Sequence, residues 1–321
     1  MDGTIPIAPT GVEEAPTRVD DLWFPDHNLV IQAENRLFRV SGGILAARSL
    51  VFRDMLSIPQ PETQPLIDGC PIVVLHDSAI DVEYFLKAVF DSSFFERPPA
   101  PTTFPIVAGV LNLSTKYDVS YLRHRALLHL ASASPMSLEE YDSIGSTATF
   151  PHRTSRLSRL LLADSLGMTW AMPTGMYAIS CLKAQSILDG IPVQGGTIHI
   201  TSALQRACVI AHPELCIAQN HHIYRFLRVL PTKGCTSDGV CSVRSRSLLE
   251  TFTKLERLDP LGFLDAGWSK ALQDRFCPAC NARSETEYKS ARQAVWNQLP
   301  SIFSLPTWEE LKSARTADLS E

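Results

Sequence analysis

The four cysteines nearest the C-terminus form the strongest chemical pattern in the sequence. Cys277 and Cys280 form a CxxC motif, CPAC, and Cys235 and Cys241 lie in the stretch PTKGCTSDGVCS. A CxxC turn can direct two thiolates at one ion, and a tetrahedral structural zinc site needs two further ligands. The CxxxxxC spacing of the first pair is looser than that of a zinc knuckle. The sequence therefore leaves two interpretations open, a zinc site formed by all four residues or four reduced cysteines in loops.

A redox role for the CxxC motif is the weaker interpretation. A thioredoxin-type motif follows a strand and begins a helix, whereas here a helix over residues 261–276 is expected to precede the motif. The remaining cysteines are isolated, and Cys181 and Cys208 fall inside expected helices, where a free thiol packs as a small hydrophobe. Eight cysteines without a secretory signal indicate reduced thiols. We therefore expect a cytoplasmic or nuclear protein.

Other reactive residue types do not form a recognisable catalytic frame. His221 and His222 are adjacent, so on a helix they point about 100° apart and do not chelate one ion together. Glu139-Glu140 and Glu309-Glu310 lie in expected first helical turns, where carboxylates interact favourably with the helix dipole. The sequence contains no GxSxG, GxxxxGK[ST], GxGxxG or HExxH motif. We expect a protein that is not an enzyme and that requires no cofactor other than the zinc ion considered above.

Composition and charge narrow the function classes further. The 321 residues carry a formal net charge of −5, which argues against a dedicated nucleic-acid-binding protein. The Arg153, Arg156 and Arg159 run is interpreted as the solvated face of a helix rather than as a basic stripe. No segment approaches the roughly 18–20 apolar residues of a membrane span, so we expect no membrane partner.

The elements that position these residues divide into two regions. Residues 1–20 are acidic and Pro-rich and are expected to form a flexible tail rather than a signal peptide. Residues 21–135 are expected to form a mixed α/β domain, and residues 136–321 a predominantly α-helical domain.

In the α/β domain, apolar runs predict three strands, and Glu34-Asn35 is a candidate hairpin turn. The expected strands cover residues 28–34, 36–40 and 72–75, and the expected helices cover 41–47, 49–56, 78–90, 106–116 and 120–131. Ser49 and Ser78 are expected to cap the second and third of these helices.

In the C-terminal domain, Ser137 and Glu140 form a capping-box pattern that begins the first helix. Further helices are expected over 155–166, 174–188, 202–211, 220–229, 245–257, 261–276, 285–298 and 307–315.

The segment from Asp26 to Leu130 resembles the BTB (POZ) domain. The resemblance rests on Asp26 followed by LVIQAE, on the block LFRVSGGILAARSLVFRDML, on PIVVLHD and on the run VLNLSTKYDVSYLRHRALLHL. The C-terminal region, above all WNQLPSIFSLPTWEEL, resembles the helical part of BTB proteins common in mushroom-forming fungi. The resemblance implies a small, mainly three-stranded sheet with helix pairs, followed by an α-helical C-terminal domain.

Within the domain, the resemblance implies a set of core and block residues. These residues are Asp26, Leu45, Ser49, Phe52, Met55, Leu56, Lys116 and Tyr117. The sequence departs from the family pattern after the second strand, where Ser41 and Gly42 replace a His and a basic residue. Asp26 could supply the acid of the charged pocket found in some members, but Gly42 cannot supply the base.

The resemblance also implies function. BTB domains pair with themselves or with other proteins, so it implies a non-enzymatic interaction protein that oligomerises or recruits a partner. The alternatives are an adaptor that presents clients to a cullin-type ubiquitin ligase and a transcription-associated scaffold. A metal-dependent or enzymatic helical domain carried by a BTB module is the least favoured interpretation.

Overall fold

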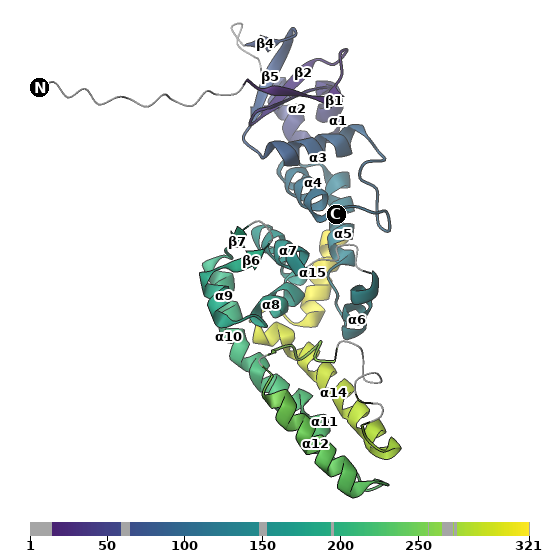
Figure 1. Ribbon diagram of the computed structural model, residues 1–321. Helices are drawn as coiled ribbons and strands as arrows, with labels where there is room; N and C mark the ends of the chain where they lie inside the picture. The colour runs from purple at the N-terminus through teal and green to yellow at the C-terminus, as the bar shows by residue number, and fades with distance from the viewer. Residues whose placement is uncertain are drawn as a thin grey trace, which may run out of the picture. The chain divides into compact units, whose positions relative to one another are not determined.

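The computed structural model describes residues 15–58, 65–147, 153–193, 196–255, 257–264, 272 and 275–320. The chain forms two compact units, which divide between His129 and Leu130, inside helix α5. We call the part up to His129 unit 1 and the part from Leu130 unit 2 (Figure 1).

Unit 1 contains a mixed five-stranded sheet in the order β1-β3-β2-β5-β4. The strands are β1 (Thr17–Trp23), β2 (Leu29–Ala33), β3 (Arg36–Val40), β4 (Leu66–Ile67) and β5 (Cys70–Leu75). The central strand β2 pairs antiparallel with β3 and parallel with β5. It is buried over most of its length, as its apolar sequence LVIQA requires.

Two strands were not expected from the sequence, which predicted a mainly three-stranded sheet. β1 pairs parallel with β3 and occupies residues 17–20 of the expected flexible tail, so that part of the tail prediction is wrong. Its sequence TRVDDLW buries only Leu22, and therefore shows no period-two alternation. β4 is only two residues long and returns to β5 through Asp68 and Gly69, both at positive φ. Residues 1–14 of the expected tail lie outside the described residues.

The remaining elements of unit 1 confirm the expected order. Glu34-Asn35 is the two-residue turn between β2 and β3, with Ala33 opposite Arg36 and Glu34 at φ +47°. The helices are α1 (Gly42–Arg48), α2 (Leu50–Ser57), α3 (Ala79–Phe90), α4 (Phe104–Lys116) and α5 (Ser120–Ser132). Ser49 caps α2 as expected, but the Ser78 side chain does not cap α3. Instead, the backbone N–H of Ala79 donates to Glu34 Oε2 at 3.2 Å.

Unit 2 is mainly helical, as expected. Its helices are α6 (Leu138–Thr147), α7 (Arg153–Ser165), α8 (Pro173–Ser180), α9 (Ala184–Asp189), α10 (Ser202–Ala218), α11 (Arg225–Arg228), α12 (Asp238–Thr253), α14 (Pro278–Ile302) and α15 (Trp308–Ser320). A short 3₁₀ helix, η1 (Thr169–Ala171), precedes α8, and a π-helical turn, η2 (Gln219–Ile223), continues α10. A short hairpin of β6 (Ile191–Val193) and β7 (Gly196–Ile198) was not expected from the sequence.

Several boundaries in unit 2 differ from the expected ones. The segment 174–188 forms two helices, α8 and α9, and α10 continues through Pro213 instead of ending before it. The expected helix 261–276 lies largely outside the described residues, and residues 261–264 form a turn. The capping box is present, because Ser137 Oγ accepts the N–H of Glu140 at 3.1 Å. Among the described residues, no helix combines the length and the apolar character needed to cross a bilayer.

The basic run at the start of α7 is not uniformly solvated. Arg156 is exposed, but Arg159 is buried and donates a hydrogen bond to the carbonyl oxygen of Ala133. Burial lowers the pKa of Arg159 to about 10. The interpretation of this run as an exposed face is therefore wrong at Arg159, whose guanidinium joins α7 to the residues that follow α5.

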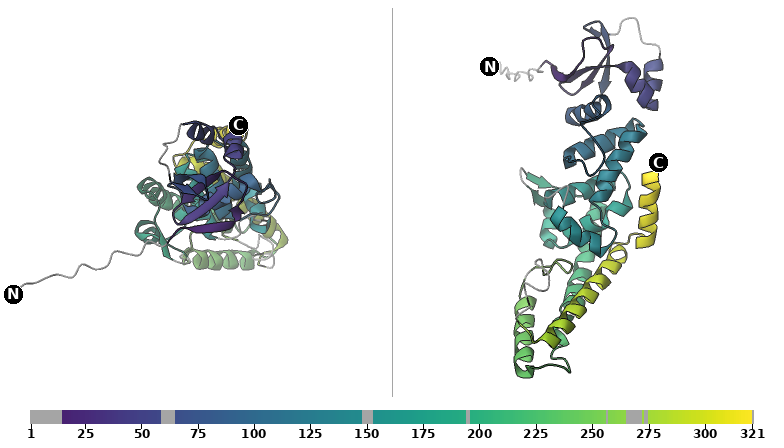
Figure 2. Two further views of the ribbon diagram at one scale, coloured as in Figure 1. Left: turned by 90° about the horizontal axis from the view of Figure 1, so that it is seen from above. Right: turned by 90° about the vertical axis from the view of Figure 1, so that its right-hand side faces the viewer.

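An arm of unit 2 contains α11, α12 and α14, and α11 packs against both longer helices. In Figure 1 the N-terminal ends of α12 and α14 lie together at the tip of the arm. α14 then leads through a bend at residues 303–307 into α15 (Figure 2). At this bend the Trp296 and Trp308 rings stack with centroids 4.8 Å apart. The block WNQLPSIFSLPTWEEL therefore forms the joint between the last two helices.

Candidate functional site

Ser49 links the helix pair of unit 1 to the end of α4. Its hydroxyl oxygen accepts the backbone N–H of Phe52 at 3.0 Å, and the hydroxyl donates to the carbonyl oxygen of Tyr117 at 2.5 Å. The Phe52 and Tyr117 rings pack beside this bond, with centroids 4.7 Å apart. Three of the expected block residues therefore meet at one buried position.

Asp77 completes this cluster and was not identified from the sequence. Its two carboxylate oxygens accept hydrogen bonds from Lys116 Nζ at 2.6 Å and from the Tyr117 hydroxyl at 2.5 Å. Burial, together with the bond to Asp77, raises the pKa of Tyr117. The signal in the sequence was the position of Asp77, two residues after the end of the apolar strand β5. This cluster keeps Tyr117 protonated and has a structural role.

The other expected block residues occupy different environments. Leu45 is buried in the core, while Met55 and Leu56 are only partly buried. Asp26 is exposed and contacts His27 Nδ1 at 3.0 Å, so it is not a core residue and does not form a buried charged pocket. At Gly42, the backbone N–H donates to Asn28 Oδ1 at 3.1 Å.

The helix pair exposes several large apolar side chains. Ile44 is 42% exposed, Leu50 49%, Val51 37% and Ile58, which follows α2, 62%. We call these four residues the α1–α2 face. Single apolar side chains are ordinary on a protein surface, whereas a contiguous patch of them marks an interaction site, so these four make the helix pair a candidate interface.

The four C-terminal cysteines come together in unit 2. The sulfur atoms of Cys235, Cys241, Cys277 and Cys280 all lie within 4.8 Å of one another. The Cys235 and Cys277 sulfurs are 3.7 Å apart. Cys241, Cys277 and Cys280 are buried, Cys235 is half-buried, and all four are free thiols. We call this group the cysteine cluster.

Three local structures position the cysteine cluster. Cys235 lies in a turn closed by its own N–H and the carbonyl oxygen of Thr232, 3.0 Å away. Cys241 lies in the first turn of α12, so the expectation of a loop is wrong for this residue. Cys277 is the N-cap of α14 and Cys280 lies in its first turn, because Pro278 begins a helix readily at the first position.

Polar groups surround the sulfurs of the cysteine cluster. The N–H of Ser237 donates to Cys235 Sγ at 3.4 Å, and the N–H of Cys277 donates to Cys241 Sγ at 3.3 Å. The N–H groups of Cys280 and Thr236 face the Cys277 sulfur and lower the pKa of Cys277 to about 5. Burial raises the pKa of Cys235 and Cys241. The site therefore stabilises negative charge on the Cys277 sulfur. A bound cation would stabilise negative charge on the other sulfurs as well.

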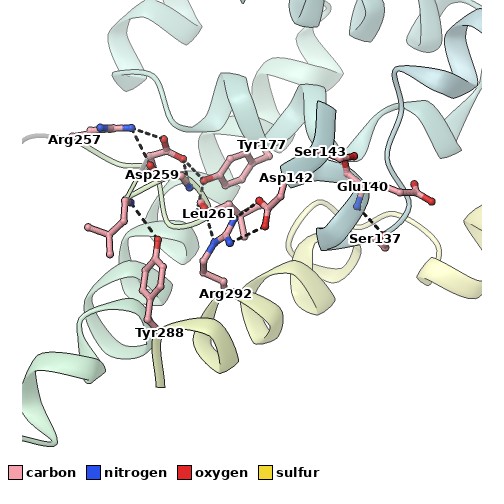
Figure 3. A network of polar contacts seen from close by, with 12 residues as sticks. Ser137, Glu140, Asp142, Ser143, Tyr177, Arg257, Asp259, Leu261, Tyr288 and Arg292 are labelled. Carbon is pink, nitrogen blue, oxygen red and sulfur yellow. Dashed lines mark hydrogen bonds and ion pairs between the residues drawn. The ribbon is translucent and has the colours of Figure 1, made fainter. Parts of the chain in front are cut away.

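A network of polar contacts fastens the base of the same arm (Figure 3). The Tyr177 hydroxyl donates to Asp259 Oδ1 at 2.7 Å and accepts the N–H of Leu261 at 2.8 Å. Arg292 Nε on α14 donates to the carbonyl oxygen of Leu261 at 2.7 Å, and its guanidinium pairs with both oxygens of Asp142. These residues are up to 150 positions apart, so no local sequence pattern predicts the network.

A cavity of about 390 Å³ lies beside η2 in unit 2. Cys181, Cys216 and His212 line it. Burial raises the pKa of both thiols, so they are protonated and weakly nucleophilic. His212 lies inside α10, not at a helix end as its position before Pro213 suggests, and its Nδ1 is 2.7 Å from the carbonyl oxygen of Ser180. These contacts are those of a packed interior rather than of an activated nucleophile.

No family model, curated protein or solved structure matches the chain.

Proposed function

We propose that this protein acts by binding other proteins, that unit 1 is a BTB-like interaction module, and that it self-associates through the α1–α2 face. The observation that carries the proposal is the exposure of Ile44, Leu50, Val51 and Ile58 on one helix pair. Burial of apolar side chains of this kind supplies about 25 cal/mol per Å² of apolar surface removed from water. Binding through this face would need no catalytic residue.

The order of elements in unit 1 supports the BTB-like part of the proposal. A β-hairpin leads into the helix pair α1–α2, the parallel strand β5 follows, and α3, α4 and α5 complete the unit. The block from Leu37 to Leu56 forms β3 and this helix pair, and Ser49 and Tyr117 connect it to α4. The exposed Asp26 and the uncharged Gly42 favour binding through apolar contact rather than through a charged pocket.

The charge of the α1–α2 face favours a second copy of the chain as the partner. On α2, Arg53 Nε lies 3.5 Å from Asp54 Oδ1, so the two exposed charges lie side by side. The other charge of the helix pair, Arg48 on α1, lies over the Tyr121 ring at 5.6 Å, so the pair carries one net positive charge. A face with so small a net charge can meet its own copy with little like-charge repulsion, as a two-fold interface requires. The roles of cullin adaptor and transcription-associated scaffold stay predictions.

Sedimentation of the full chain with two matched variants tests this proposal. Leu50→Asp combined with Val51→Asp places charge on the α1–α2 face. Ile210→Asp combined with Ile217→Asp alters two side chains of α10 that are 54% and 51% exposed. We expect the wild type and the α10 variant to form dimers and the α1–α2 variant to be a 35.5 kDa monomer. A monomeric wild type, or an α1–α2 variant that remains a dimer, would contradict the proposal.

A further inference from the structure

We propose that Cys235, Cys241, Cys277 and Cys280 bind one structural zinc ion, which joins the N-terminal ends of α12 and α14. The inference concerns unit 2 and is independent of the proposed function of unit 1. It starts from the arrangement of the sulfurs, which converge from three local structures, with Cys235 and Cys277 42 positions apart along the chain.

The distances within the cysteine cluster fit a tetrahedral metal site. Zinc–sulfur bonds of about 2.3 Å in a tetrahedron place the sulfurs about 3.8 Å apart. The Cys235 and Cys277 sulfurs are 3.7 Å apart, and every other pair lies within 4.8 Å. A disulfide requires about 2.05 Å between sulfurs, so the Cys235–Cys277 pair has the separation of two ligands on one ion.

The donor set identifies the ion and its role. Four thiolates suit a soft or borderline cation, whereas Mg²⁺ and Ca²⁺ prefer oxygen ligands. Tetrahedral sites of four sulfurs hold either zinc or iron, and closed four-cysteine sites are typical of structural zinc. With all four positions occupied by protein sulfur, no position remains for water or a substrate. The zinc is therefore structural rather than catalytic.

The surroundings of the cysteine cluster suit a zinc–thiolate centre, which carries a net charge of about −2 with four thiolates. Backbone N–H groups of Ser237 and Cys277 donate to two of the sulfurs, as outer-shell groups do at zinc sites. Arg244 on α12 donates to the carbonyl oxygen of Arg275, two residues before Cys277, at 3.1 Å. The Arg244 guanidinium therefore lies against the segment that leads into Cys277 and Cys280.

The position of the site defines what the zinc does. The base of the arm is fastened by the Tyr177, Asp259 and Arg292 network, which requires no metal (Figure 3). At the tip, α12 and α14 begin close together, and the cysteine cluster connects them. Zinc bound there would hold the tip of the arm closed, because binding to the folded arm and not to the unfolded chain stabilises the folded state.

The metal content of the full chain, purified with a reducing agent and without chelator, tests the proposal. We expect one zinc per chain by elemental analysis. A variant with Cys277→Ser and Cys280→Ser should lose this zinc, while the control with Cys181→Ser and Cys216→Ser should retain it. The proposal is overturned by a wild type that holds iron or no metal, by disulfides within the cysteine cluster, or by equal zinc in both variants.

Chelation of the wild type provides a second measurement that does not depend on whether the variants fold. Removing zinc should increase amide hydrogen exchange in the first turns of α12 and α14, and adding zinc alone should restore protection. The amides of α7 and α8 should keep their protection. Unchanged exchange at the tip after complete removal of the metal would overturn the structural role.

Discussion

The Ser49 hydroxyl donates a 2.5 Å hydrogen bond to the carbonyl oxygen of Tyr117, 68 positions away along the chain. Both residues are buried. The same hydroxyl oxygen accepts the N–H of Phe52 and so begins α2. One small side chain therefore fixes both the start of α2 and its position against the end of α4.

Ser49→Ala should destabilise unit 1 by about 2–3 kcal/mol, because it removes a helix cap and leaves a buried carbonyl without its donor. Ser41 is the matched control. It caps α1 by accepting the N–H of Ile44 at 3.2 Å at a more exposed position. Ser41→Ala should cost about 1 kcal/mol. Urea-dependent amide exchange in α2 and α4 measures the stability that each variant loses. Equal losses in the two variants would contradict the role of the hydrogen bond to Tyr117.

Alanine substitution should have opposite effects on stability at two glycines, Gly109 at the close approach of α3 and α4 and Gly43 on α1. A Cβ at Gly109 would lie 2.7 Å from Asp81 Oδ1 and 3.3 Å from its Cα, so Gly109→Ala should destabilise unit 1 by about 1–3 kcal/mol. Gly43 lies in α1 with its nearest neighbour at 3.8 Å. Gly43→Ala should stabilise the helix by about 0.5–1 kcal/mol. Thermal unfolding of both variants should show shifts of opposite sign, and shifts of the same sign would refute this account of the packing.

Unit 1 should lose stability in acid because of His129. This side chain is fully buried, its Nε2 lies 2.8 Å from the carbonyl oxygen of Glu96, and burial lowers its pKa. The folded state therefore binds fewer protons than the unfolded state as the pH falls below about 6.5, and stability decreases there by up to about 1.4 kcal/mol per pH unit. Above about pH 6.5, His129 is neutral in both the folded and the unfolded state, and its protonation does not reduce the stability of unit 1.

His129→Gln does not titrate and can still donate to Glu96. The variant should therefore unfold at a urea concentration that depends less on pH below about 6.5 than that of the wild type. A pH dependence identical in the two proteins would exclude His129 as the cause.

The C-terminal helix α15 is anchored by a bond between Trp170 and Asp318. The buried indole Nε1 donates to Asp318 Oδ2 at 2.6 Å, across 148 positions of the chain. Asp318→Ala leaves the indole N–H without this acceptor and should cost unit 2 about 1–3 kcal/mol. Asp318→Asn keeps an acceptor oxygen and should cost less. Amide exchange in α15 measures the stability loss of each variant. Equal protection of α15 in the two variants would contradict the anchoring role of Asp318.

The sequence predicted the parts of the fold whose local patterns are strong. The apolar residues of Val82 to Phe90 recur at helical spacing and predicted α3, and the pair Glu34-Asn35 predicted the β2–β3 turn. β1 was missed because only Leu22 in TRVDDLW is buried, so pairing with β3 rather than local pattern defines the strand. α10 continues through Pro213 because packing of a long helix outweighs the loss of one backbone hydrogen bond.

In the candidate sites, too, the sequence predicted what local spacing determines and missed what contacts between distant residues determine. The CxxC spacing identified Cys277 and Cys280, but the looser spacing of Cys235 and Cys241 did not establish that they join the same cluster. Cys241 is brought to the site by the first turn of α12, which the sequence placed in a loop. Asp77 was missed because its partners, Lys116 and Tyr117, are about 40 positions away.

Hydrogen–deuterium exchange of the full chain at low and high protein concentration tests the proposed self-association most directly, because it locates the interface. The account predicts that amides of α1 and α2 become more protected as the concentration rises, while those of α10 do not change. Leu50→Asp combined with Val51→Asp should abolish this concentration dependence. Protection of α1 and α2 that is the same at every concentration would contradict the claim that this protein self-associates through the α1–α2 face.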